Sequence, residues 1–358
     1  MDEIKHSRPA VTVIIVNYNS AKNLKVILEA VRSALELDYS PLEIIVVDNG
    51  STDGTDKALQ TLLSDHHKVA VKFVKLRKNV GFGAANNFAY AHRDTSSRYV
   101  ALINSDLAPA QGSLRALVDC MEKHPEAAGV QGKILTWDGS RIDNAGFHLS
   151  RSWFPFPRGV MKPADTRYPE VSLSYLDGAY SVYSVAAIRK IRTFFVEEFF
   201  LYGDDYEIGL RLWKAGFTLR YCDVVSGRHY RGATMEGIQT SLAYFQWRGL
   251  IGTIVMHDPY WFISISLRIP FIFRSSTTYM KFATKGALSG LILGLKLKRR
   301  LGKLGGNDGA PKFSRVPLPK LWVFMLKMKI VGHDKRVSNV RGGIVLQYSL
   351  AKSFGELF

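Results

Sequence analysis

The sequence contains little cysteine and no long hydrophobic run. Cys120 and Cys222 are its only cysteines, and two cysteines so far apart make neither a disulfide framework nor a cluster of zinc ligands. We therefore expect a reducing, cytoplasmic environment. No stretch reaches the roughly 18 uncharged apolar residues of a membrane-spanning helix, and residues 1–10 lack the basic and apolar regions of a signal peptide. The sequence therefore predicts neither export nor a membrane span.

Several common enzyme motifs are also missing. The sequence has no Walker lysine motif, no G-x-S-x-G nucleophile elbow and no H-E-x-x-H metal motif. The stretch "GFGAAN", residues 81–86, has only the first two glycines of the dinucleotide fingerprint, and it follows the third predicted strand instead of the first. A dinucleotide-binding oxidoreductase is therefore disfavoured. The two glycines instead predict a tight turn, or a close approach of the backbone to a neighbour or a ligand.

Acidic residues are scarce toward the C-terminus. From Arg268 to Phe358 there are 18 Lys and Arg residues but only three acidic ones, so this segment carries +15 of the chain's net charge of +17. Such a charge predicts an anionic partner, either nucleic acid or a membrane surface. Apolar runs such as "PYWFISISLRIPFIF" border the charges, which favours an interfacial amphipathic region over a surface that reads bases. We therefore predict that residues 241–358 associate with an anionic membrane, and we expect no nucleic-acid partner.

The first 130 residues alternate between apolar strands and helical patterns. Buried strands are predicted at residues 11–16, 42–47, 69–76 and 99–104, with a helix at residues 24–37. This alternation is typical of a doubly wound, mostly parallel α/β sheet. Ligands bind such sheets beyond the carboxyl ends of the strands. The polar residues at these ends include Asn17, Asn19, Asp48, Asn49, Asn104 and Asp106. They are also ordinary turn residues, but the acids that recur at the same topological position favour one polar crevice.

Residues 133–174 lose this pattern and become rich in aromatic residues and proline. We interpret them as a long loop over the sheet, with "RSWFPFPRGV" at its centre. Within it, Trp153 either stacks on a sugar or closes a small core, and the sequence does not distinguish these roles.

The segment "FLYGDDYEIGLRLWKAGF", residues 200–217, places three acids at the start of a predicted helix. Apolar residues recur at helical spacing after Asp205, and Gly216 predicts the end of the helix. Asp204 is expected to be the N-cap, and Glu207 is expected to close a capping box. This structural interpretation leaves Asp205 without a role.

Seven segments occur in a recognisable order: "VTVIIVNYNS", "IIVVDNGSTDGT", "NVGFGAANNFA", "LINSD", "LDG", "FFLYGDDYEIGLRLWKAGF" and "HYRGAT". The series resembles the motifs of glycosyltransferase family 2, most closely its rhamnosyltransferase-like members, over roughly residues 9–250. The resemblance implies a GT-A fold, a nucleotide-sugar donor, a divalent metal (Mg or Mn) and inversion at the anomeric carbon. It also implies a transferase domain at residues 1–240, with a nucleotide-sugar-binding half at 1–132 and an acceptor-binding and catalytic half at 133–240.

The resemblance assigns roles to single residues. Asp106 matches the last acid of the D-x-D motif, with Asn104 in place of the first, and His229 matches the late histidine, so Asp106 and His229 are the expected metal ligands. Asp177, together with Trp153, is expected on the acceptor side. The residues expected to bind the nucleotide-sugar are Asn17, Asn19, Asp48, Asn49, Gly81, Asn86, Asn104 and Asp106.

The helix start resembles the E-D motif of the family. Asp205 stands at the Asp position, which implies that it is the general base, and Asp204 at the Glu position is its rival. An inverting transfer needs one ionised carboxylate to accept the proton of the attacking hydroxyl. We expect the helix N-terminus to keep Asp205 ionised.

The resemblance also implies the general classes of donor and acceptor. The leading donor is dTDP-rhamnose and the next is a UDP-hexose, and the expected acceptor is a glycan or a polyprenyl-diphosphate-linked glycan in cell-surface polysaccharide synthesis. The expected location is the cytoplasm, peripheral on the inner face of the cell membrane, with a possible homo-oligomer. The alternatives are an inactive family member that acts as a partner subunit and a basic nucleic-acid-binding protein. Intact Asp48, Asp106 and Asp205 argue against the first.

Overall fold

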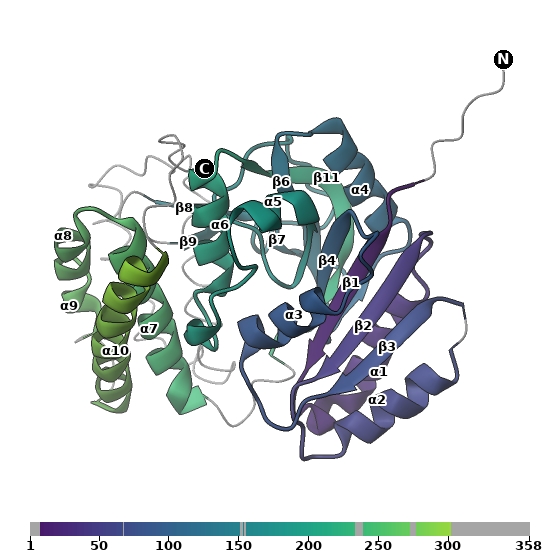
Figure 1. Ribbon diagram of the computed structural model, residues 1–358, viewed down its shortest axis with the longest axis horizontal. Helices are drawn as coiled ribbons and strands as arrows, with labels where there is room; N and C mark the ends of the chain where they lie inside the picture. Colours follow the sequence, from purple (N-terminus) through teal and green to yellow (C-terminus); the bar gives the residue numbers. More distant parts are fainter. Residues whose placement is uncertain are drawn as a thin grey trace.

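The computed structural model describes residues 8–66, 68–150, 153, 155–232, 239–272 and 277–301. Residues 273–276 and 302–358 of the predicted basic region at 241–358 therefore lie outside the described residues, and only the rest of it is discussed below. The described chain forms a central sheet with helices on both faces and a group of helices at one end (Figure 1).

The first half of the sheet confirms the four predicted strands. These are β1 (Val11–Asn17), β2 (Leu42–Asp48), β3 (Ala70–Lys75) and β4 (Tyr99–Asn104). They lie in the order β3-β2-β1-β4, and all three pairings are parallel. The intervening helices are α1 (Leu24–Leu35), α2 (Thr55–Ser64) and α3 (Phe82–Ala91), with a short 3-10 turn at Ala21–Asn23. The parallel order brings the carboxyl ends of β1, β2 and β4 to one edge of the sheet.

The second half of the sheet is mixed, because β10 (Tyr180–Ser184) inserts antiparallel between β4 and β6 (Ala127–Thr136). Beyond β6 lie β11 (Thr218–His229), which runs parallel to it, and β5 (Leu107–Pro109) at the edge. The helices of this half are α4 (Ser113–Lys123), α5 (Val185–Lys190) and α6 (Asp204–Lys214), with a 3-10 turn at Glu197–Phe199. The fold is thus a doubly wound, mostly parallel α/β sheet, as the sequence predicts.

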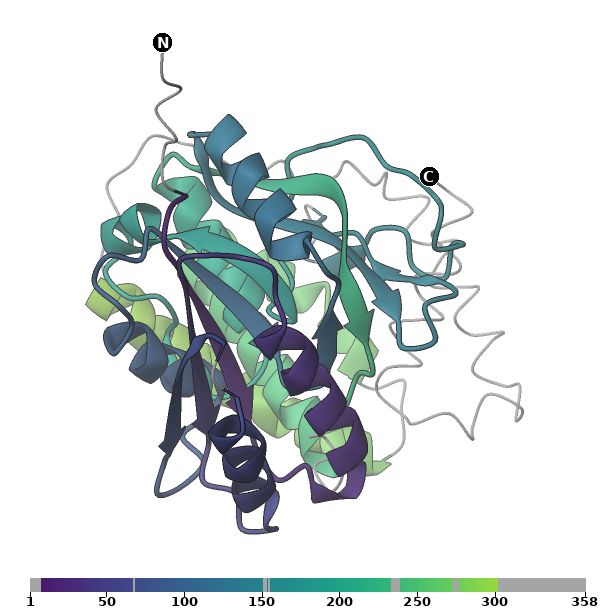
Figure 2. The same ribbon diagram turned by 90° about the vertical axis from the view of Figure 1, so that its right-hand side faces the viewer.

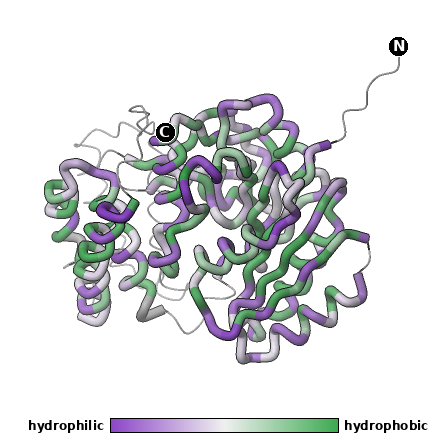
Figure 3. Tube along the Cα trace, viewed as in Figure 1, coloured by the Kyte–Doolittle hydropathy of each residue, from purple (hydrophilic) through white to green (hydrophobic). Residues whose placement is uncertain are grey.

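Two apolar cores lie on opposite faces of the sheet. Helices α1, α2 and α4 bury apolar side chains on one face, and α3, α5 and α6 do so on the other. Alternate residues of one strand serve the two faces: Val13 and Ile15 point into the first core and Ile14 into the second. The near-continuous apolar strands are visible along the centre of Figure 3. Burial on both faces explains why these strands are not amphipathic.

Residues 133–174 do not form the structureless loop that we expected. They complete β6 and contain three short strands, β7 (Ile142–Asn144), β8 (Phe147–Leu149) and β9 (Pro155–Pro157). β7 pairs with β6, and β8 and β9 form a separate two-stranded sheet. Strands of three residues are too short to show an alternating apolar pattern, so they could not be predicted from the sequence.

The C-terminal helices lie at the end of the molecule remote from β3 and α2 (Figures 1 and 2). They are α7 (Gln239–His257), α8 (Trp261–Ser266), α9 (Ile269–Ile272) and α10 (Thr277–Leu301). Gly286, Gly290 and Gly294 bring α10 against the backbone of α7, where a Cβ atom at Gly286 would stand 2.2 Å from the Tyr244 carbonyl oxygen. Among the described residues, no helix combines the length and the apolar character needed to cross a bilayer.

The two cysteines form a disulfide bond, which the sequence analysis did not anticipate. Cys120 lies on α4 and Cys222 on β11, and their Cα atoms are 6.5 Å apart although 102 positions separate them in sequence. Spacing in the sequence did not indicate the pairing because the packing of α4 against β11 creates it. The prediction of a reducing environment, which rested on unpaired cysteines, loses its premise.

Candidate active site

The polar residues at the ends of β1 and β2 form one connected group. Asn17 and Asp48 are fully buried, and the Asn17 Nδ2 atom lies 3.5 Å from Asp48 Oδ1. The backbone N–H of Ser51 donates to Asp48 Oδ2 at 2.9 Å, and that of Thr52 donates to Asn19 Oδ1 at 2.9 Å. The structure therefore brings Asn17, Asn19 and Asp48 together, while their contact with a nucleotide stays a prediction.

Asn49 and Gly81 order the turn before α3. The Asn49 side chain accepts from the Val80 backbone and donates to the Gly81 carbonyl oxygen at 3.3 Å. Gly81 has a φ of 90°, and a Cβ atom there would stand 2.4 Å from the carbonyl oxygen of Phe200. The glycine thus permits a close approach to the segment before α6. This contact is one of the alternatives that the sequence left open.

The remaining residues predicted to bind the donor have mixed surroundings. Asn86 is buried inside α3, and its side chain donates to the Phe82 carbonyl oxygen at 2.9 Å. Asn104 ends β4 with a partly exposed side chain, and its backbone N–H donates to the Ala179 carbonyl oxygen at 2.9 Å. The geometry supports a structural role for Asn86, and its predicted donor contact gains no support from it.

Asp106 and His229 contact each other at the carboxyl end of the sheet. β11 pairs His229 with Leu107, and the His229 Nε2 atom lies 3.1 Å from Asp106 Oδ1. On its other side, His229 Nδ1 lies 3.5 Å from Asp143 Oδ2. Burial disfavours a charged imidazole, but the charge of Asp106 and the hydrogen bonds to both carboxylates outweigh it and raise the His229 pKa to about 9. The imidazole thus lies between two carboxylates.

A chain of ionic contacts continues from this pair toward α6. Arg231 Nε donates to Asp143 Oδ1 at 2.5 Å, and Arg231 Nη2 lies 3.4 Å from Asp177 Oδ2. The Asn144 side chain donates to the same Asp177 oxygen at 2.7 Å. Burial works to raise the pKa of Asp143, but Arg231 and His229 hold it well below its usual value. Three carboxylates, one imidazole and one guanidinium therefore form a continuous group, which is buried except for the partly exposed Arg231.

Asp205 lies at the far end of this chain. The backbone N–H of Gly178 donates to Asp205, and a Cβ atom at residue 178 would stand 2.6 Å from Asp205 Oδ1. Desolvation, followed by the charges of Asp177 and Asp204, raises the pKa of Asp205 well above its ordinary value. The helix N-terminus therefore does not hold the pKa of Asp205 down as expected, because loss of solvation and like charges outweigh the helix dipole.

Asp204 has a different environment. It is the first residue of α6, and Gly203, with a φ of 97°, takes the N-cap position instead. Its side chain is buried beside Gly83, and burial raises its pKa to about 7. Asp204 is therefore not the N-cap that we predicted.

Glu207 does not close a capping box either. It is fully buried and accepts two hydrogen bonds from Arg211 Nε at 2.8 and 2.9 Å, and His257 Nε2 lies 3.2 Å from its Oε1. An Arg four residues later on the same helix competes successfully for the carboxylate. Glu207 therefore joins α6 to α7.

Trp153 lies in a core and not in an open crevice. It packs among apolar residues that include Phe147, Tyr175 and Trp247, and its indole N–H donates to Asp258 Oδ2 at 2.8 Å. Of the two roles left open by the sequence, this packing corresponds to the small core. The predicted contact with the acceptor gains no support from it.

Sequence reasoning missed Asp143, Arg231 and the Glu207–Arg211 pair. Arg231 lies in the quoted segment "HYRGAT", two residues after His229, so its position was a usable signal. Asp143 follows β6 in the region interpreted as a loop, where nothing in the sequence pointed to the sheet.

The topology and the site together define a GT-A nucleotide-sugar transferase fold, and comparisons with known proteins agree. Residues 12–192, just over half of the chain, match the model of Glycosyl transferase family 2, and the chain belongs to this family. It is 26% identical over 244 residues to the N-acetylglucosaminyl-diphospho-decaprenol L-rhamnosyltransferase of Mycobacterium tuberculosis, which covers 61% of this chain and 75% of that protein.

The chain is also similar to other glycosyltransferases. The chain is 28% identical over 209 residues to the GalNAc(5)-diNAcBac-PP-undecaprenol beta-1,3-glucosyltransferase of Campylobacter jejuni, covering 58% of this chain and 60% of that protein. The mannosyltransferase PcManGT of Pyrobaculum calidifontis, in complex with GDP-Man and Mn2+, superposes with a TM-score of 0.53 at 15% identity over 98% of this chain and 87% of that one. S. aureus TarS 1–349 with UDP-GlcNAc gives 0.54 at 17% identity, covering 82% and 86%. At such identities these two structures establish the fold alone.

Proposed function

We propose that the chain is an inverting, metal-dependent glycosyltransferase that moves a sugar from a nucleotide-sugar to a lipid-linked glycan in cell-surface polysaccharide synthesis. One observation carries the proposal: ionic contacts run from the Asp106–His229 pair through Asp143 and Arg231 to Asp177, and the backbone N–H of the next residue, Gly178, donates to Asp205. A group suited to a metal and a candidate base are thus held in one buried assembly at the carboxyl end of the sheet.

The residues at Asp106 fit a divalent cation. Asp106 offers a carboxylate oxygen and His229 an imidazole nitrogen, while Asp143 contacts the other ring nitrogen. A carboxylate at the second nitrogen is the usual way to orient a metal-binding histidine. Two protein ligands suffice for Mg²⁺ or Mn²⁺ when phosphate oxygens and waters complete the shell. When bound, the ion would neutralise the negative charge that develops on the departing nucleoside diphosphate.

The chain's own residues supply the proton transfer and the positioning. Asp205 would accept the proton of the acceptor hydroxyl. At the same time, the hydroxyl oxygen would form the new bond to the anomeric carbon, and the bond from this carbon to the diphosphate would break. The N–H of Gly178 stabilises the ionised form of Asp205, and Arg231 lies close enough to lower its pKa. The raised pKa of Asp205 makes it a stronger base once it is ionised.

The donor and the acceptor are proposed from the relatives' names. The mycobacterial relative is an L-rhamnosyltransferase on a decaprenyl diphosphate, and the Campylobacter relative is a glucosyltransferase on an undecaprenyl one. We therefore propose dTDP-rhamnose first and a UDP-hexose second, with a polyprenyl-diphosphate-linked acceptor. Incubation of the purified chain with each donor, with Mg²⁺ or Mn²⁺ and with such an acceptor tests this. An inverted anomeric centre in the product supports the mechanism, and a retained one contradicts it.

Asp106→Asn should weaken metal-dependent donor binding by roughly a hundredfold, because it removes the carboxylate charge at the metal. Excess EDTA should abolish transfer by the unaltered chain. Donor binding is measured by calorimetry with and without Mn²⁺, and Asp65→Asn, an exposed residue at the end of α2, is the control. Full transfer in excess EDTA would assign Asp106 another role.

The described part of the C-terminal region supports an association with an anionic membrane. The outward face of α10 carries Leu288 and Ile292, which are 61% and 63% exposed, between Lys281 and Lys285 on one side and Arg299 on the other. These residues lie on one helical stripe opposite the glycines that face α7. α8 adds Phe262 and Ile263, which are 55% and 49% exposed. Exposed apolar residues flanked by basic ones are typical of an interfacial helix.

Leu288→Ser combined with Ile292→Ser should reduce binding to anionic vesicles by about tenfold, because it removes two apolar side chains available for insertion. Lys281→Glu combined with Lys285→Glu should reduce it in a salt-dependent way. Cosedimentation with vesicles of varied anionic lipid content measures both effects. Met161→Ser, an exposed apolar residue outside these helices, is the control. Equal binding to neutral and anionic vesicles would contradict the electrostatic part.

A further inference from the structure

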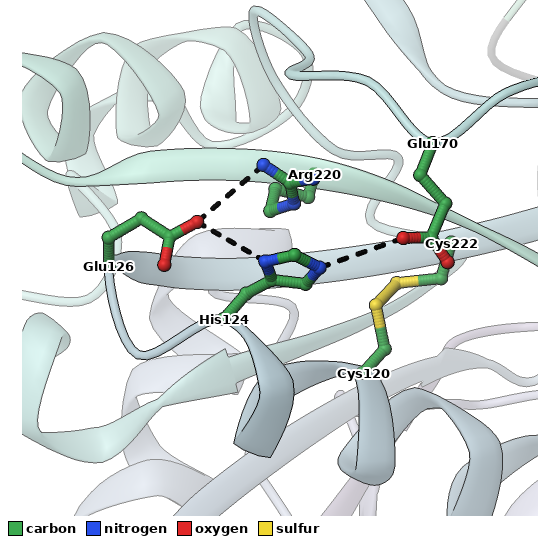
Figure 4. Close-up of a disulfide and its surroundings, with 6 residues drawn as sticks. All are labelled: Cys120, His124, Glu126, Glu170, Arg220 and Cys222. Atoms are coloured by element: carbon green, nitrogen blue, oxygen red, sulfur yellow. Dashed lines mark ion pairs between the residues drawn. A yellow bond between two sulfur atoms is a disulfide. The ribbon is translucent and has the colours of Figure 1, made fainter.

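Cys120, His124, Glu170 and Cys222 gather on the side of the sheet covered by α4 (Figure 4). Cys120 lies on α4, His124 directly follows this helix, and Cys222 lies on β11. Glu170 comes from the segment before β10 and lies beside His124 (Figure 4). No residue of the active site belongs to this group.

The atoms that could bind a metal are already close together. One ligand atom from each of Cys120, His124 and Glu170 lies within 4.8 Å of the other two. A tetrahedral zinc ion, with bonds of about 2.0–2.3 Å, places its ligand atoms roughly 3.3–3.8 Å apart. The three groups therefore need to approach one another by about 1 Å, which side-chain rotation supplies for the exposed Glu170 and the partly exposed His124. The second sulfur, of Cys222, is bonded to the first.

The orientation of His124 also fits a metal ligand. Its Nε2 atom faces Glu170 Oε2 at 3.6 Å, and its Nδ1 atom lies 3.4 Å from Glu126 Oε1. The same Glu126 oxygen lies 3.5 Å from Arg220 Nη1, so it contacts a guanidinium as well as the imidazole. A histidine whose second nitrogen faces a carboxylate presents the other nitrogen to a metal. Two sulfurs, one imidazole and one carboxylate form a donor set suited to Zn²⁺.

We propose that the reduced chain binds one zinc-class ion through Cys120, Cys222, His124 and Glu170, and that this site and the disulfide exclude each other. A dithiol supplies the two electrons and two protons that convert the S–S bond into two thiols, and it leaves as a cyclic disulfide. Metal binding then displaces the two thiol protons to solvent. In either state, α4 remains linked to β11, by a covalent bond or by the ion.

Cobalt(II) is the probe, because thiolate ligands give it a near-ultraviolet charge-transfer band that oxygen and nitrogen ligands do not. The full-length chain, reduced with a dithiol that is then removed without air, should take up one Co²⁺ with this band and with the strong visible bands of tetrahedral geometry. One equivalent of Zn²⁺ should displace it. The oxidised chain should show no thiolate band, and ions bound at Asp106 do not produce one.

Substitutions distinguish a four-ligand metal site from cobalt binding by two free thiols alone. Glu170→Gln changes an exposed side chain and should weaken cobalt binding at least tenfold, and His124→Ala should do so more strongly. Glu126→Gln should weaken cobalt binding about tenfold, because the carboxylate that orients the His124 imidazole is lost. His92→Ala, an exposed histidine on another surface, should bind as the parent does. The proposal is overturned if the reduced parent shows no thiolate band, or if Glu170→Gln and His124→Ala both bind cobalt with unchanged affinity.

Discussion

Asp205→Asn is expected to lower the transfer rate by about two orders of magnitude or more, the scale of losing a general base. The substitution keeps the size and shape of the side chain, and an amide oxygen still accepts the hydrogen bond from Gly178. What is lost is a group that can take the proton of the acceptor hydroxyl. Donor binding in the presence of metal should persist. Initial rates with the lipid-linked acceptor and calorimetric titration of the donor measure the two quantities separately.

The pH profile provides a second test of Asp205. Desolvation and neighbouring carboxylates raise its pKa well above the ordinary value, so the residue is protonated and inactive as a base at low pH. The value of kcat/KM in the parent should therefore rise with pH, and the rise should lie at higher pH than for an ordinary aspartate. In Asp205→Asn, the residual transfer should lack this rise.

Stability distinguishes the loss of a base from the loss of the fold. Because the folded pKa of Asp205 is raised, the folded chain holds its proton more tightly than the unfolded chain, and this contribution to stability declines as pH rises above the unfolded value. At neutral pH, ionisation of Asp205 is less favourable in the folded chain than in the unfolded one, and this lowers stability. A neutral asparagine does not ionise, so the midpoint of thermal unfolding at neutral pH should be equal to the parent's or higher. An inactive variant that also unfolds earlier would not identify a base.

Asp204→Asn is the matched comparison for Asp205→Asn. Asp204 is buried beside Gly83, and burial raises its pKa to about 7. It does not contact Gly178 in the way that Asp205 does, so the rate should fall much less in Asp204→Asn. The reverse result, near-parental transfer by Asp205→Asn and loss in Asp204→Asn, would exchange the roles of the two residues.

The sequence predicted the parts of the fold that have a long local pattern. The strands β1, β2 and β4 are six or seven residues of nearly unbroken apolar character, buried on both faces, and their parallel direction follows from the helices between the strands. Strands β7, β8 and β9 have three residues each, so no periodicity can reveal them. The antiparallel insertion of β10 depends on the tertiary fold and has no local signal.

The same distinction between local and long-range features applies to the candidate site. The positions of Asp106 and Asp48 followed from the ends of predicted strands, and the structure places both there. The contacts of Asp143 with His229 and Arg231 span 86 and 88 positions, and the disulfide spans 102. Such contacts depend on how β11 lies beside β6, which one sequence does not specify. Glu207 shows the opposite error: a local capping pattern was present, but the carboxylate binds Arg211 on the same helix and His257 on α7 instead.

Arg211 is the centre of the buried network that this pattern concealed. It is fully buried, and its guanidinium donates to Glu207 and to the carbonyl oxygens of Ile191, Thr193 and Phe194. Burial works to raise the pKa of Glu207, but the charge of Arg211 and hydrogen bonds from Arg211 and His257 lower it to about 2. The network fixes α6, which carries Asp204 and Asp205 at its start, against the segment before it and against α7.

Arg211→Met is therefore expected to lower the free energy of unfolding by about 3–5 kcal/mol, because it leaves the Glu207 carboxylate buried without its countercharge. Combining it with Glu207→Gln should recover part of this loss, since no uncompensated charge then remains. Arg115→Met is the control. It breaks an exposed ion pair with Asp38, 41% and 68% exposed, and should cost no more than about 1 kcal/mol. Urea denaturation measures all three variants.

The pH dependence of stability should change in the same variant. The folded pKa of Glu207, about 2, lies below the unfolded value near 4.3, so its contribution is complete above pH 5 and is lost as pH falls toward 2. Arg211→Met should raise this pKa and remove that part of the acid dependence. If Arg211→Met unfolds at the same urea concentration as Arg115→Met, the network contributes nothing to holding α6. The position of Asp205 would then depend on Gly178 and the sheet alone.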